Sequence, residues 1–103
     1  MYAKDAALKG IQIALAARGF KWPEKGAKDK DSVVARLMAF DALHNLTGLS
    51  RSAISMLVSN SPSNTTNMIQ RVERCYRTPI DRANWIVQAR ASIDAVLSQQ
   101  EVA

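Results

Sequence analysis

The chain is poor in the residues that build covalently stapled folds, metal sites and most catalytic centres. Its 103 residues include one cysteine, Cys75, and one histidine, His44. A single cysteine excludes an intramolecular disulfide, and one Cys with one His is too few for a zinc site of the usual type. A catalytic thiol needs a base, and His44 is the one histidine available. We therefore expect Cys75 to be a core thiol and His44 to have a structural role near a helix end.

Other chemical signals are also missing. The sequence has no Gly-rich phosphate loop, and its carboxylates are scattered beside basic residues, as on solvated faces. It has no signal-peptide pattern and no apolar run near ~20 residues. We expect a protein that is not an enzyme, that holds no cofactor or metal, and that works in the reducing cytoplasm without a membrane partner.

What the chain does have is apolar content and positive charge. Apolar residues make up 48% and charged residues 22%, which is typical of a globular protein. The length fits one domain, residues 1–103, with one modest core. Fourteen Lys and Arg oppose nine Asp and Glu, giving a formal net charge of +5. That balance favours an anionic partner: nucleic acid, an acidic protein or a membrane surface.

Apolar periodicity predicts an all-α protein of five to six helices. Helices are expected over 3–18, 33–45 and 51–58, from Ser63 or Asn64 to about Tyr76, and from Pro79 to about Ser98. Gly19 ends the first, and "TGLS", "SNSPS" and "RTPID" separate the others. Asp31 or Ser32, Ser50, and Thr78 followed by Pro79 and Asp81 are the expected caps.

One apolar face per helix is expected to form the core, with Phe20 and Trp22 anchoring the loop after the first helix. The expected inward residues are Ala7, Leu8, Ile11 and Leu15; Val33, Leu37, Phe40 and Leu43 or His44; Ile54, Leu57 and Val58; Ile69, Val72 and Cys75 or Tyr76; and Ile86, Ile93 and Val96 or Leu97.

The short helix, the polar turn and the helix after it have the layout of a helix-turn-helix over about residues 50–77. The second helix would open with Ser63, Asn64, Thr65, Thr66 and Asn67. Short side chains that donate and accept hydrogen bonds suit base edges and phosphates in a major groove. Arg71, Arg74 and Arg77 would lie opposite its apolar stripe. The pattern alone fits a capped helix with ordinary polar decoration equally well.

A family resemblance adds to this pattern. The segment "VARLMAFDALHNLTGLSRSAISMLVSNSPSNTTNMIQRVER" resembles the C-terminal DNA-binding domain (domain IV) of the bacterial replication initiator DnaA. "NLTGLSRSAIS", Asn45 to Ser55, is similar to the family's "ELT" and "SLPEIG" runs without a gap, and "SNTTNM" is similar to "RDHTTV". The likeness covers roughly Val33 to Leu97. It implies a Trp-repressor-like helix-turn-helix bundle that binds double-stranded DNA.

The departures from the family limit what the resemblance implies. One or two extra residues lie between Ile54 and Thr66, and the motif's Arg, Asp and His are replaced by Ser, Asn, Thr or Pro. Val34 lies near the place of the arginine that family members insert in the minor groove. The initiator's target sequence therefore does not carry over. The ATPase module is also missing, so the chain looks like a stand-alone relative or the DNA-binding part of a larger regulator.

Together, these observations predict a double-stranded DNA-binding regulator, acting on transcription. The alternatives are a regulator of replication initiation and a protein-interaction module, so replication or transcription proteins are further candidate partners. The basic loop that contains Lys25, Lys28 and Lys30 is expected to contact phosphates. The expected DNA-binding residues are Lys25, Lys28, Lys30, Ser50, Arg51, Ser61, Ser63, Asn64, Thr65, Thr66, Asn67, Gln70, Arg71 and Arg74.

Overall fold

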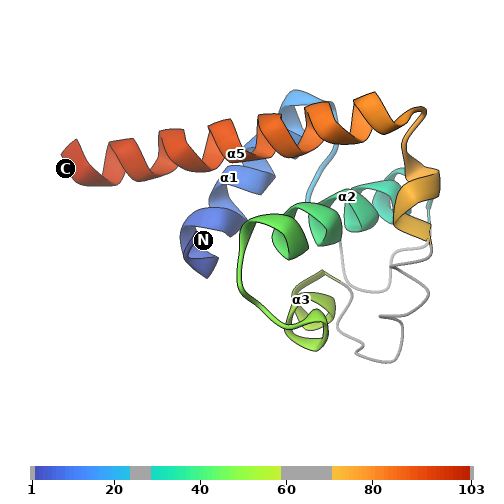
Figure 1. Cartoon of the computed structure of the whole chain (residues 1–103), viewed down its shortest axis with the longest axis horizontal. Coiled ribbons are helices and arrows are strands. Elements are labelled where there is room, and N and C mark those ends of the chain that lie inside the picture. Colours follow the sequence, from blue (N-terminus) through green and yellow to red (C-terminus); the bar gives the residue numbers. More distant parts are fainter. Residues whose placement is uncertain (1, 24–28, 59–70, 103) are drawn as a thin grey trace.

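The protein is all-helical over the part that the computed structural model describes, residues 2–23, 29–58 and 71–102. This part holds four α-helices, one 3-10 turn and no strand (Figure 1). The elements are α1 (Lys4–Ala17), α2 (Lys30–Leu46), α3 (Arg51–Val58), η2 (Glu73–Cys75) and α5 (Pro79–Val102). The all-α prediction is confirmed. The start of the second helix of the expected helix-turn-helix lies outside the described residues.

Helices α1 and α5 pack side by side in opposite directions (Figure 1). At one end the Tyr2 hydroxyl donates to Asp94 Oδ1 at 2.7 Å. At the other end Arg18 donates to Gln88 Oε1 at 2.7 Å, and its guanidinium lies 5.3 Å from the centre of the Trp85 ring. Between them, Gly10 lets the two backbones approach, because a Cβ there would stand 2.6 Å from Ile93 Cα and N.

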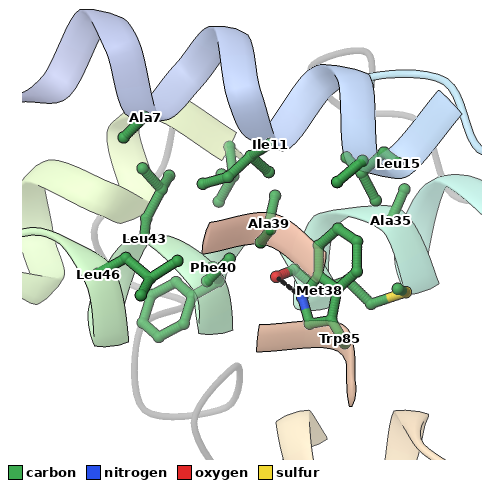
Figure 2. Close-up of a cluster of buried hydrophobic side chains, with 14 of the residues drawn as sticks. Ala7, Ile11, Leu15, Ala35, Met38, Ala39, Phe40, Leu43, Leu46 and Trp85 are labelled. Carbon is green, nitrogen blue, oxygen red and sulfur yellow. Dashed lines mark hydrogen bonds between the residues drawn. The ribbon is translucent and has the colours of Figure 1, made fainter. Parts of the chain in front are cut away.

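The core fills the space between α1, α2 and α5 (Figure 2). Ala7, Ile11 and Leu15 of α1 point at α2, as the apolar face of the sequence predicts. Trp85 is fully buried, and its indole N–H donates to the Met38 carbonyl at 3.0 Å. A buried indole needs such a partner, so this bond fixes the register between α5 and α2. The sequence analysis did not single out Trp85.

Most expected helix ends are confirmed. Ser50 caps α3 by accepting from the Ala53 N–H at 3.2 Å, and Thr78 caps α5 by accepting from the Asp81 N–H at 3.1 Å. Gly19 follows α1 with a φ of 87°, which a glycine adopts without strain. Phe20 and Trp22 pack against the core, half-buried.

Three details of the expected helices are wrong. The cap of α2 is Asp29 rather than Asp31 or Ser32: its backbone is extended, and its carboxylate accepts from the Ser32 N–H at 3.1 Å. The helix expected to reach Tyr76 has α-helical geometry only as far as Val72. It continues as the 3-10 turn η2, and Tyr76 then has an extended backbone. Helix α5 continues past Ser98 to Val102, since no Pro or Gly interrupts it.

The expected inward faces are largely confirmed in the described residues. Leu43 is buried and His44 exposed, which decides between the two alternatives on α2. Ile54 and Val58 of α3 are buried, while Leu57 is half-buried beside them. None of the helices in the described part combines the length and apolar character needed to cross a bilayer.

Candidate nucleic-acid interface

Five of the expected DNA-binding residues lie in the described part, and all five are exposed: Lys30, Ser50, Arg51, Arg71 and Arg74. The other nine lie outside the described residues: Lys25, Lys28, Ser61, Ser63, Asn64, Thr65, Thr66, Asn67 and Gln70. The geometry of the candidate interface therefore rests on the first five.

Three of these residues, cations from two segments far apart in the sequence, surround one surface groove. Lys30 begins α2, Arg71 lies in the last helical turn before η2, and Arg74 lies in η2 itself. The groove encloses about 470 Å³ and is completed by Val33, Val34, Leu37 and Cys75. We call it the cationic groove. It forms because η2 packs against the N-terminal half of α2 (Figure 1).

The charges around the cationic groove face solvent. Among the described residues, Lys30, Arg71 and Arg74 have no ion-pair partner. The carboxylates nearest to these cations along the chain are Asp29, Asp31 and Glu73, and Asp29 is engaged as the cap of α2. Hydrogen bonds from Ser32, through its side chain and its N–H, lower the pKa of Asp29. Three cations on one rim concentrate positive potential where an anion can approach.

Helix α3 is held next to α2 by a side chain that the sequence analysis missed. Arg36 Nε donates to the Val58 carbonyl at 3.2 Å, at the last residue of α3. A cation at a helix C-terminus satisfies a free carbonyl and complements the helix dipole. Ser50 and Arg51 lie at the opposite end of α3 and do not line the cationic groove. The described residues thus give two separate polar areas rather than one.

A buried carboxylate lies behind this surface. Asp41 of α2 is 2% exposed and accepts from the Tyr76 hydroxyl at 2.8 Å. Arg82 donates to both oxygens of Asp41, from Nε at 3.0 Å and from Nη2 at 2.8 Å. Asn45 Nδ2 also donates to the Asp41 carboxylate, at 2.9 Å. A buried charge persists only when it is paired and hydrogen-bonded in this way. One signal was visible in the sequence, an aspartate inside the apolar run "LMAFDAL".

Cys75 and His44, the two residues considered for catalysis from the sequence, both have structural contacts. Burial raises the pKa of the Cys75 thiol to about 11, so the thiol stays protonated near neutral pH, and its Sγ lies 3.0 Å from the Val72 carbonyl. The exposed His44 ring stacks on Phe40, with ring centres 6.2 Å apart. Among the described residues, no three His, Cys, Asp or Glu side chains gather as metal ligands would.

Comparison with known proteins adds no relative to these observations. No protein-family model matches the chain, and neither a curated protein nor a solved structure matches it.

Proposed function

We propose that the chain is a double-stranded DNA-binding regulatory protein that uses a DnaA-like helix-turn-helix and acts on transcription. The observation that carries the proposal is the cationic groove, where Lys30, Arg71 and Arg74 come together without carboxylate partners among the described residues. Phosphate contacts by Lys and Arg supply most of the affinity of DNA-binding proteins and fix their position on the duplex.

The helical arrangement supports the proposal in a second way. Helix α3 would be the first helix of the motif, and its N-terminal Ser50 and Arg51 are exposed. Asn64, Thr65, Thr66 and Asn67 would open the recognition helix. Asn can bond an adenine edge in two places, and a Thr methyl can contact a thymine methyl. The cations that follow, Arg71 and Arg74, would hold the backbone and set the docking angle.

The first experiment is a selection of bound sequences from random duplex DNA, with binding then measured at several salt concentrations. Replacing Lys30, Arg71 and Arg74 together with Ala should weaken binding to preferred and scrambled duplexes alike. It should flatten the salt slope by about 2–3 units, since each phosphate contact contributes about 0.9. In a matched control, Lys4, Lys9 and Lys21 are replaced with Ala. These lysines are also exposed, so the control removes the same number of charges from a place outside the groove. The control should change the slope by less than about 1 unit.

Base reading is tested separately. Replacing Asn64 or Asn67 should cost ~1–3 kcal/mol on the preferred duplex and little on scrambled DNA. Circular dichroism confirms that each variant is folded. If folded Asn64 and Asn67 variants keep full discrimination, the recognition-helix assignment is wrong. If the wild-type chain binds no duplex, the DNA-binding proposal itself fails.

Control of replication initiation is the nearest alternative, and the same site would serve it. A protein-interaction role differs physically, because an interface with an apolar centre loses little affinity as salt rises, whereas phosphate contacts lose much. A second groove on this molecule has the features of such an interface.

A further inference from the structure

Residues of the segment 71–76, which packs against α2, line two different grooves. Cys75 lines the cationic groove on one side, and Tyr76 lines a second groove on the other. This second groove, the α2–α5 groove, encloses about 770 Å³, and none of the described residues lines both grooves. It is lined by Asn45, Tyr76, Arg77, Thr78, Pro79, Arg82, Ala83 and Ile86.

The walls of the α2–α5 groove are fixed from behind by the buried carboxylate. Asn45, Tyr76 and Arg82 all line the groove, and all three donate hydrogen bonds to Asp41. Helix α2, the segment after η2 and helix α5 are therefore all bonded to one buried carboxylate. A groove whose walls are already ordered loses less conformational entropy when it binds, so its affinity for a partner is higher.

The charge of the groove points to an acidic partner. Among the described residues that line it are two arginines and no carboxylate. Arg82 is paired with Asp41 at 2.8 Å, so its charge is largely compensated. Arg77 is exposed and has no ion-pair partner among the described residues, so it leaves a net positive charge at the rim.

The groove and its border are also apolar, which argues for a protein rather than a nucleic acid. Pro79, Ala83 and Ile86 supply the apolar lining on α5. Ile80 and Val87 flank Ala83 at helical spacing and are 72% and 66% exposed, among the most exposed large apolar side chains described. A phosphate backbone cannot cover such side chains, whereas a peptide can bury them and place a carboxylate on Arg77.

We infer that the α2–α5 groove docks a short acidic segment of a protein partner, with an apolar side chain of that segment packed on Pro79, Ala83 and Ile86. The inference does not depend on the proposed DNA binding, because none of the described residues lines both grooves. A chain with both sites would connect a DNA site to a second protein.

The test uses the full chain as bait for a displayed library of random 16-residue peptides. Enriched peptides are synthesised with a fluorescent label, and their affinity is measured by anisotropy. Ala83→Glu puts a bulky carboxylate into the groove from an exposed helical position. Ala91→Glu is the matched control, the same change at an exposed position of α5 outside the groove.

The enriched peptides should combine carboxylates with at least one large apolar residue. Ala83→Glu should lower the affinity for these peptides about tenfold or more, and Arg77→Gln should lower it about threefold to tenfold. The affinity of Ala91→Glu should stay within about twofold of wild type. The inference fails if nothing is enriched, if the peptides lack acidic residues, or if Ala83→Glu binds them as well as wild type. The inference also fails if Ala83→Glu weakens the binding of duplex DNA as strongly as the binding of peptide, since DNA would then be the occupant. It fails too if the substitution dissociates a dimer of the chain, since a second copy would then be the occupant.

Discussion

At the scale of single residues, the molecule is organised around Asp41. Its carboxylate is the most buried charge described, and its four hydrogen bonds come from α2, from the segment after η2 and from α5. Removing one donor to a buried carboxylate costs more than an average hydrogen bond, because the charge cannot recover a water molecule in its place. The Tyr76 hydroxyl is the donor that can be removed with the least change of shape.

Tyr76→Phe should therefore lower the free energy of unfolding by about 1.5–3 kcal/mol, the usual range for hydrogen bonds to charged groups. Tyr2→Phe is a matched control, since it also removes one hydroxyl bonded to an aspartate, but at an exposed site. The control should change stability much less, because water can replace the lost partner at an exposed site. Urea denaturation of both variants measures the difference, and equal effects would show that Asp41 does not depend on Tyr76.

At the scale of elements, the closest approach is that of α1 to α5. A glycine inside a helix normally costs stability, so a change to Ala in an open position is a gain of about 0.5–1 kcal/mol. At Gly10 the added Cβ would meet Ile93 at 2.5 Å from Cγ1 and 2.6 Å from Cα and N. Two of these three atoms belong to the backbone and cannot rotate away.

Gly10→Ala should accordingly destabilise the protein by about 1–3 kcal/mol, the range found for overpacked cores. Shortening the side chain opposite should not rescue it, because Ile93→Ala leaves the backbone contact in place. The double variant should be at least as unstable as either single variant in thermal denaturation. Recovery of stability in the double variant would mean that the clash is with the Ile93 side chain alone.

At the scale of the whole molecule, the titration of one buried and one half-buried side chain limits stability in alkali. Burial, followed by the negative charge of Asp41, raises the pKa of Cys75 from 9.0 to about 11. The same two causes, with the hydrogen bond to Asp41, raise the pKa of Tyr76 above its usual 10.0. In both cases the folded protein holds its proton more tightly than the unfolded chain does.

Stability should therefore be complete below about pH 9 and fall as the pH rises through 9 to 11, because there the unfolded chain has released protons that the folded protein retains. Urea denaturation at pH 8 and at pH 10.5 measures the loss. The double variant Cys75→Ser, Tyr76→Phe should be less stable at pH 8 but should lose less between the two pH values. A loss as steep as that of wild type would assign the alkaline transition to other groups.

Much of the local structure could be predicted from the sequence. Ser50, Thr78 and Gly19 act where they stand in the chain, because a cap or a left-handed residue depends on neighbours within four positions. The cap of α2 was misplaced by two or three residues, since Asp29, Asp31 and Ser32 lie within four positions and any of the three could have served. Of the candidate interface, the cationic residue types could be predicted, but their grouping could not.

What the sequence by itself determined is the all-helical fold, the positive charge and most helix ends, because periodicity, composition and capping are local properties. Only the tertiary structure decided which distant residues meet. Lys30 joins Arg71 and Arg74 at one groove, and Asp41 pairs with Arg82, 41 positions away. These contacts depend on how η2 and α5 pack against the rest of the fold. That packing is set by residues whose partners lie on other helices, among them the bulky Trp85 and the small Gly10.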